Sequence, residues 1–575
     1  MHRILAIAVL GVCLSGCKQD PPQRTANASA PAKASAAAAA IEVDLRYLAD
    51  DKLEGRDAGT RGYDLAAEYV AERYKQIGLR PAGEDGTFFQ KVPLLKAVRQ
   101  QQGASLVIDR NGGKVSLEFL EEFVPGFNYN AAEHSVNAAA VFVAQAVHAP
   151  ELEQDDFAGV DVRGKIAVVF PGAPARFDND RRAFYSNSSQ KLRTLAERGA
   201  VGVVFVGTPQ YEERGSWASG SAKWDMPGMR LRAADGSGLN SFPELKATAA
   251  VSAAAAAKVF AGSGHDAPAL FAANVEGALK PFDLPGTLTL AGRTRIEPVE
   301  SRNVVARLDG SDAALAGEFI AYTAHLDHIG IGAPVNGDSI YNGAMDNALG
   351  VSIMLQAATE LAGAPVRQKR TLLFIALTAE EKGLLGAEWF ASHPTVPKPD
   401  LVANINMDMP VLLAPSSDVV PIGIEHSTLK SALATAADEI GLGLSADPFP
   451  EEVVFVRSDQ YAFVREGIPA VYLDGGVEPA SPGGASPRDA MDAFLRKCYH
   501  QPCDDASQPI QYDDAARLAR LNARIGTLVG NAAERPQWNK GDFFGDRFAP
   551  ASGKPASGTP ASGTPGSSKP ASSNP

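Results

Sequence analysis

Six side chains in the second half of the chain are of the types that bind divalent metal ions and carry protons during hydrolysis. Five of these imidazole and carboxylate groups could form a ligand set for two metal ions, and the sixth, a carboxylate beside one of them, could act as a base. The six residues are His325, Asp346, Glu380, Glu381, Asp408 and His500. Their types indicate a hydrolase that uses two zinc ions.

Three apolar runs that predict buried strands precede most of these residues. The runs cover residues 318–321, 371–377 and 401–407. His325 follows the first run and Asp408 follows the third, while Glu380 and Glu381 come just after the second. Ligands gather at the carboxyl ends of parallel strands in open α/β sheets, so the ends of these three strands are where such a fold would place a site.

The remaining acids of this region lie in loops. Asp346 belongs to a Gly- and Asn-rich segment, and residues 351–358 after it have a helical composition. Asp327 stands two residues after His325, where we expect its carboxylate to accept the ring N–H of a metal-bound imidazole and to fix the tautomer. We expect His328 to line the pocket or to be a polar residue with its hydrogen bonds satisfied, rather than to bind metal.

Five short motifs occur in order along the chain: H-x-D at 325–327, G-x-x-D-N-A-x-G at 343–350, E-E at 380–381, N-x-D-M at 406–409 and Y-H-x-P-x-D at 499–504. Together they resemble the motifs of the M28 family of zinc-dependent exopeptidases. The resemblance extends to residues 53–62, to the helix expected at 66–77, and to Ser458-Asp459-Gln460-Tyr461. It implies a metallopeptidase with two Zn²⁺ ions and peptide substrates.

The resemblance also implies which residues hold each zinc ion. One zinc would be bound by His325 and Asp408, the other by Glu381 and His500, and Asp346 would bridge the two. A shared carboxylate of this kind suits two cations that lie about 3.5–4 Å apart.

The same resemblance assigns the groups that act on the substrate. Glu380 would be the general base, moving a proton from water to the leaving amine. Tyr499 would donate a hydrogen bond to the developing oxyanion. A non-proline cis peptide bond is expected between Asp346 and Asn347, at a functional site where such a bond is tolerated.

Several functions remain open on the sequence alone. We favour an aminopeptidase, with a carboxypeptidase, a dipeptidase, a glutaminyl cyclase or a non-catalytic scaffold lipoprotein as alternatives. The chain has Gln460 and Ala462 where related proteins often have His and Pro, so side-chain specificity is open. Arg457, next to that motif, is either a surface arginine or a partner for a carboxylate of the pocket or substrate.

The first 17 residues resemble a lipoprotein signal peptide. A basic start and an apolar run at 4–14 lead to Leu14-Ser15-Gly16-Cys17, in which Cys17 would carry lipid and anchor the protein. Lys18 favours the outer membrane of a Gram-negative cell, facing the periplasm. The alternative is a secreted protein with an ordinary signal peptide.

Cys498 and Cys503 flank His500, and in an oxidising periplasm they could form a disulfide. The alternative is that they supply two more zinc ligands, although the M28 pattern places no thiolate in the site. We expect the disulfide.

Composition divides the chain into two domains between low-complexity ends. We expect an α/β fold of the zinc exopeptidase, phosphorylase/hydrolase-like type: a mixed, mostly parallel sheet sandwiched by helices. The segments around 160–170 and 189–205 resemble a β-rich protease-associated (PA) domain, which would wall the active site. The expected parts are a signal peptide at 1–17, a disordered tether at 18–40, the M28 peptidase domain at 41–126 and 286–536, the PA insertion at 127–285, and a disordered Pro/Ala/Ser/Gly-rich tail at 537–575.

The formal net charge of −13 argues against nucleic acid as a partner. The same negative charge argues against binding of the protein surface to an anionic membrane, so we expect membrane contact through the lipid anchor only. The oligomeric state is not indicated by any motif.

Overall fold

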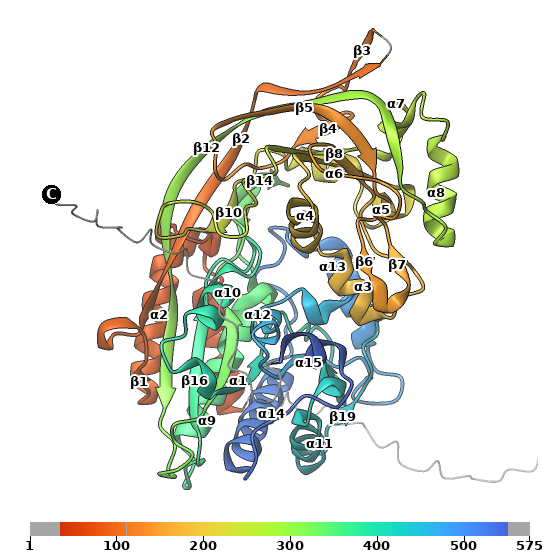
Figure 1. Ribbon diagram of the computed structural model, residues 1–575. Coiled ribbons are helices and arrows are strands. Elements are labelled where there is room, and N and C mark those ends of the chain that lie inside the picture. The colour runs from red at the N-terminus through yellow and green to blue at the C-terminus, as the bar shows by residue number, and fades with distance from the viewer. Residues whose placement is uncertain (1–34, 111, 550–575) are drawn as a thin grey trace, which may run out of the picture.

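The computed structural model describes residues 35–110 and 112–549. They form two α/β bodies joined by a pair of long strands (Figure 1). The larger body is the mixed, mostly parallel sheet between helices that the sequence predicts.

The sheet of the larger body follows the strand order β18-β20-β17-β13-β16-β12. Strands β20, β17, β13 and β16 run parallel, and β18 and β12 flank them in the antiparallel direction. The bounds are β12 Phe282–Leu308, β13 Phe319–His325, β16 Thr371–Leu377, β17 Leu401–Asn406, β18 Asp418–Ile422 and β20 Ala470–Asp474.

Helices cover both faces of this sheet, and this explains why its inner strands are continuously apolar. Every residue of β13 and β16 is buried, as parallel strands with two covered faces require. On one face lie α1 Ala36–Leu48, α2 Arg61–Ile77, α9 Gly350–Ala362, α11 Leu429–Ile440 and α14 Tyr512–Asn531. On the other lie α10 Leu385–Ser392 and α12 Gln460–Arg465.

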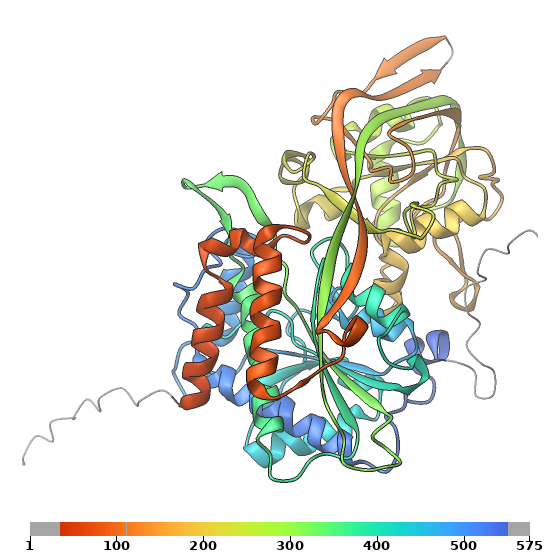
Figure 2. The same cartoon turned by 90° about the vertical axis from the view of Figure 1, so that its left-hand side faces the viewer.

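Two long strands connect the bodies. β2 Phe89–Arg110 pairs with β12 along almost its whole length, with one irregularity near Ala291. Figure 2 shows both strands rising from the peptidase sheet into the smaller body. The hydrogen-bonded sheet is therefore continuous between the two bodies.

The smaller body has its own sheet, in the order β12-β5-β8-β9-β11-β4. Its remaining strands are β4 Phe123–Pro125, β5 Glu133–Phe142, β8 Ile166–Val169, β9 Gly202–Val206 and β11 Ala247–Val251. The core of this sheet draws on side chains from Leu106 to Leu290. The core of the smaller body thus includes residues before 127, where we expected the insertion to start.

Both expected low-complexity ends are shorter than the sequence suggests. Residues 36–40 of the expected tether form the first turns of α1, whose apolar face packs on the core. Residues 537–549 of the expected tail also fold: they include α15 Phe543–Phe548, whose Phe544 is fully buried. The signal peptide, Cys17 and residues 550–575 lie outside the described residues. Within 35–110 and 112–549, no helix is both long and apolar enough to cross a lipid bilayer.

Candidate metal centre

The predicted ligands meet at the carboxyl end of the peptidase sheet. His325 is the last residue of β13, and Asp408 follows β17 by two residues. Glu380 and Glu381 come three and four residues after β16. Asp346 lies in a buried turn at Ala344–Leu349 that leads directly into α9.

The Asp346 carboxylate lies between two histidines. Its Oδ1 is 3.2 Å from Nε2 of His325, which is also 2.9 Å from Oδ1 of Asp408. Its Oδ2 is 3.2 Å from Nε2 of His500, which is also 3.2 Å from Oε2 of Glu381. One carboxylate therefore joins two groups that each contain an imidazole and a second acid, as a bridging ligand would.

The donor set fits divalent cations on physical grounds. The side chains of Asp346 and Glu381 are 5% and 4% exposed, and buried carboxylates need a compensating charge. Burial lowers the pKa of His500, but hydrogen bonds to Asp346 and Glu381 outweigh that effect and raise it to about 10. Divalent cations would supply this charge, and metal binding to such groups releases protons.

The turn around Asp346 is fixed by its neighbours. The Asp504 carboxylate accepts hydrogen bonds from the backbone N–H groups of Met345 at 2.7 Å and of Asp346 at 3.0 Å. The predicted cis peptide bond between Asp346 and Asn347 is present. Gly343 has a φ of +58°, and a Cβ atom there would lie 2.2 Å from the carbonyl oxygen of Asp346, so only glycine fits.

Asp327 does not act as we expected. The Nδ1 atom of His325 contacts the backbone oxygen of Asp327 at 3.1 Å, not its carboxylate. The carboxylate instead accepts the backbone N–H groups of Glu380 at 3.0 Å and Glu381 at 3.3 Å. Asp327 therefore orients the histidine through its main chain and the two glutamates through its side chain.

His328 is closer to the centre than we expected. Its Nδ1 atom lies 2.8 Å from Oε1 of Glu381 and 3.8 Å from Oδ2 of Asp346, and its side chain is fully buried. These three residues form a second group whose ligand atoms are close enough to hold a metal ion, beside the group of His325, Asp346 and Asp408. The sequence signal that could have indicated this position is the second histidine of the H-x-D-H segment at 325–328.

Glu380 and Tyr499 also lie at the centre. Burial raises the pKa of Glu380, and the acids Asp408 and Glu381 raise it further against the opposing effect of His325. Tyr499 stacks on the His500 ring at 3.9 Å, and burial raises its pKa, so its hydroxyl stays protonated as a donor.

The loop that carries His500 is closed by the predicted disulfide between Cys498 and Cys503. His500 itself has a φ of +56°, which an L-residue adopts only when its surroundings fix it.

A buried arginine explains the motif at 53–62. The Arg56 side chain donates to the backbone oxygens of Leu326 at 2.9 Å and Gly343 at 3.0 Å, and it also contacts the backbone oxygens of Leu48 and Asn342. It ties the His325 and Asp346 loops to the N-terminal helices. The segment is part of the resemblance at 53–62, but its sequence does not indicate this role for Arg56.

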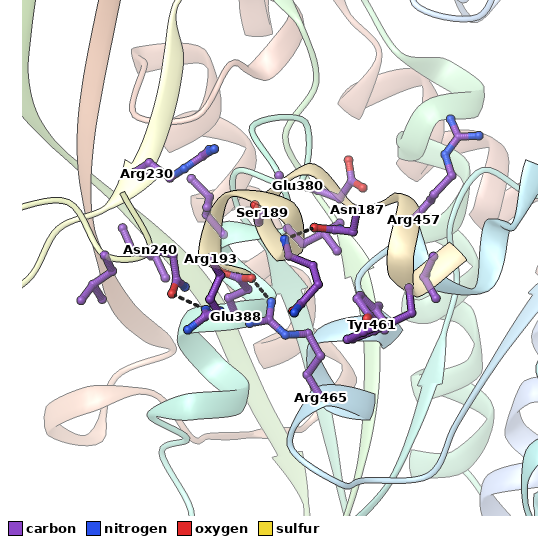
Figure 3. Close-up of a pocket in the computed structure, with 18 of the residues that line it drawn as sticks. Asn187, Ser189, Arg193, Arg230, Asn240, Glu380, Glu388, Arg457, Tyr461 and Arg465 are labelled. Atoms are coloured by element: carbon purple, nitrogen blue, oxygen red, sulfur yellow. Dashed lines mark hydrogen bonds and ion pairs between the residues drawn. The ribbon is translucent and has the colours of Figure 1, made fainter. Parts of the chain in front are cut away.

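A cavity of about 680 Å³ opens beside the centre, with Glu380 and Glu381 in its lining. Its other walls come from α4 Ser188–Glu197 and β10 Gly228–Leu231 of the smaller body, and from α15. Figure 3 shows Arg193, Arg230 and Asn240 facing the cavity from the smaller body, with Glu380 between them and Arg457. The smaller body thus forms a wall of the site.

Comparison with known proteins agrees with both predicted domains. Residues 303–525 match the model of peptidase family M28, and residues 130–239 match the model of the PA domain. These matches confirm the M28 peptidase domain with an inserted PA domain, and they support the predicted class of zinc metallopeptidase.

Curated relatives cover limited parts of the chain. Aminopeptidase Y of Saccharomyces cerevisiae is 25% identical over 230 residues, which are 38% of this chain and 37% of the relative. A vacuolar membrane protease of Lachancea thermotolerans is 35% identical over 112 residues, 20% of this chain and 10% of the relative. The chain thus spans well under two thirds of these relatives. Among solved structures, the aminopeptidase from Aneurinibacillus sp. strain AM-1 is 20% identical. The match covers 87% of this chain and 97% of the aminopeptidase chain, with a TM-score of 0.49.

Proposed function

We propose that this chain, an M28 peptidase with an inserted PA domain, is a two-zinc aminopeptidase that releases N-terminal residues from peptides. The observation that carries the proposal is the Asp346 carboxylate, placed 3.2 Å from each of two imidazoles, His325 and His500. Each imidazole has a further acid, so the set supplies ligands for two ions around one shared carboxylate. The activity of the related aminopeptidase Y supports the direction of attack.

The proposed ligand assignment follows these contacts. His325 and Asp408 would hold one zinc ion, His500 and Glu381 the other, and Asp346 both. His328 would support the second ion through its contact with Glu381. Bound zinc would supply a Lewis acid for the substrate carbonyl and lower the pKa of water.

The chain's own groups then handle the protons. Glu380 lines the cavity and lies next to the ligand Glu381, so its carboxylate can accept the proton of the attacking water. A raised pKa helps it to keep that proton until the leaving amine takes it. The Tyr499 hydroxyl can donate a hydrogen bond to the oxygen of the scissile carbonyl as negative charge develops there.

A second candidate, a carboxypeptidase or dipeptidase, has one observation in its favour. Such an enzyme must recognise the free carboxylate of its substrate, and the cavity beside Glu380 is lined by several arginines. An aminopeptidase instead needs groups that accept hydrogen bonds from a substrate ammonium.

An end-blocking assay tests the proposal. The purified protein is given one peptide in four forms: both ends free, N-acetylated, C-amidated, and blocked at both ends. An aminopeptidase cleaves the amidated form and not the acetylated one, loses this activity with a chelator, and regains it with zinc. Cleavage of the acetylated form alone would show a carboxypeptidase, and cleavage of none would leave the scaffold function. Zinc bound per chain, measured by mass spectrometry of the metal, should be two.

We also propose that Cys17 carries a lipid anchor and that the enzyme faces the periplasm of a Gram-negative cell. The basic start, the apolar run and Leu14-Ser15-Gly16-Cys17 support this proposal. Replacing Cys17 with Ser should move the protein from the membrane fraction to the soluble fraction.

A further inference from the structure

The cavity beside the metal centre is rich in arginine, although the whole chain is acidic with a net charge of −13. Five guanidinium groups line it, against three carboxylates, two of which are Glu380 and Glu381 at the metal centre. The five are Arg193, Arg230, Arg457, Arg465 and Arg547. This concentration of positive charge is therefore a local feature of the site.

Two of the arginines already have carboxylate partners. Arg457 pairs with Glu452 at 2.9 Å, and Arg465 pairs with Glu388. Within residues 35–110 and 112–549, no carboxylate lies within ion-pair distance of Arg193 or Arg230. Their charge is available to a ligand.

Neutral groups hold these two arginines in place. Arg193 donates to Oδ1 of Asn240 at 2.8 Å, and its guanidinium carbon lies 5.5 Å from the centroid of the Phe242 ring. Arg230 donates to the backbone oxygen of Met229 at 2.9 Å, and its guanidinium carbon lies 5.1 Å from the centroid of the Tyr129 ring. Amide oxygens and aromatic faces orient a guanidinium without neutralising it.

We propose that Arg193 and Arg230 bind a carboxylate of the peptide substrate, so that the PA domain supplies a specificity subsite. A guanidinium binds carboxylates through paired, charge-assisted hydrogen bonds, which makes a carboxylate the fitting ligand for this wall. The inference rests on the proposed peptidase function, because the arginines share their cavity with Glu380. The carboxylate comes from an acidic side chain near the scissile bond or from the free C-terminus of a short peptide.

The test uses matched pairs of substrates that differ by one charge. Ala-Glu-Ala-amide against Ala-Gln-Ala-amide, and Glu-Ala-Ala-amide against Gln-Ala-Ala-amide, report on a side-chain carboxylate. Ala-Ala against Ala-Ala-amide reports on a terminal carboxylate. We expect kcat/KM to favour the charged member of at least one pair by roughly 10-fold to 100-fold, and this ratio to fall at high salt.

Arginine variants connect the preference to the cavity. In Arg193→Gln, Arg230→Gln and the double variant, the ratio between charged and neutral substrates should fall toward one. Arg367→Gln is the matched control, because Arg367 is exposed and precedes β16, at the edge of the sheet opposite the site. The control should keep the wild-type ratio.

A binding measurement separates this inference from the proposed function. Calorimetry of the same peptides with Glu380→Gln protein measures the preference without turnover. Equal kcat/KM and equal affinity for charged and neutral members would overturn the carboxylate subsite while leaving the aminopeptidase intact. The opposite outcome is also distinguishable. If no peptide is cleaved but a charged peptide binds more tightly than its neutral partner, and this difference needs Arg193 or Arg230, the aminopeptidase function would be overturned and the subsite would stand.

Discussion

At the scale of single residues, two adjacent glutamates are given different tasks by their surroundings. The Asp327 carboxylate accepts the backbone N–H groups of both Glu380 and Glu381, which fixes the turn after β16. Both line the cavity, but Glu381 also contacts His328 and His500, whereas no histidine lies within ion-pair distance of Glu380 in the described part of the chain. The turn thus separates the two carboxylates in the way that the proposed roles of metal ligand and proton carrier require.

Replacing Glu380 with Gln should remove the proton carrier and keep the metal centre. We expect kcat to fall by about 10²-fold to 10⁴-fold, the usual contribution of general-base catalysis. Zinc content, measured by mass spectrometry of the metal, should equal that of the wild type because the amide replaces no ligand. Asp346→Ala is the contrasting variant: it should lose zinc and activity together. Normal turnover in Glu380→Gln would contradict the assigned role.

A buried lysine of the PA domain should make stability depend on pH. Burial lowers the pKa of Lys191 to about 7, against the opposing effect of Asp156, and its Nζ atom donates a hydrogen bond to the backbone oxygen of Gln145. In the unfolded chain a lysine titrates near about 10.4. Between pH 7 and pH 10 the unfolded state therefore binds a proton that the folded state lacks, so the free energy of unfolding rises with pH in this window.

The variant Lys191→Met should lose this rise. Relative to the variant, the wild type should gain about 2–4 kcal/mol between pH 7 and pH 10, measured by urea unfolding at each pH. Lys246→Met, at an exposed lysine of the same domain, is the control and should keep the wild-type slope. An equal slope in wild type and Lys191→Met would show that Lys191 stays charged when buried.

At the scale of elements, strand ends and loops differ in how far the sequence predicts them. His325, Glu381 and Asp408 could be placed because each follows its own apolar strand, a local pattern that is sufficient in a parallel sheet. The carboxylate contacts of Asp327 could not be predicted, because its partners come from a different strand. The continuous pairing of β2 and β12 was also missed, since it joins segments almost two hundred residues apart.

The helices at the two ends show a second limit of the sequence. Residues 36–40 are all alanine, the residue with the highest helix propensity, but a run of five is too short to form a stable helix by itself. They fold because Ile41, Leu45 and Leu48 give the same segment an apolar face that packs on the core. Tertiary packing, not local composition, decides the state of such a segment.

In the proposed two-zinc centre, the disulfide loop should control how firmly the zinc ion at His500 and Glu381 is held. Cys498 and Cys503 close the loop that carries His500 at a φ of +56°, and Asp504 at its end supports Asp346. The double variant Cys498→Ser, Cys503→Ser should weaken zinc binding by roughly 10-fold, as loss of a supporting contact usually does. Competition with a coloured chelator measures the affinity. Wild type kept in reductant should behave like the variant, and unchanged affinity in both would show that packing alone holds the loop.

At the scale of the whole molecule, three distant parts of the chain enclose the cavity. The peptidase domain supplies the loop after β16 together with α10 and α12, the PA domain supplies α4 and β10, and α15 supplies Arg547 and Phe548. The PA domain is joined to the sheet by two paired strands rather than by a flexible linker. Its position over the site is therefore part of the fold.

This enclosure should restrict the enzyme to short or unfolded substrates. We expect a compact folded protein to lose its N-terminal residue at least about 10-fold more slowly than a tripeptide of the same N-terminal sequence. The reason is that a folded substrate cannot approach Glu380 past α4 and α15. The measurement compares kcat/KM for the tripeptide, a twenty-residue unstructured peptide and a folded protein that share these residues. The unstructured peptide is the control, since it can enter the cavity end first and should resemble the tripeptide. Equal rates for all three would mean that the PA domain moves away from the site in solution and that the wall does not select by size.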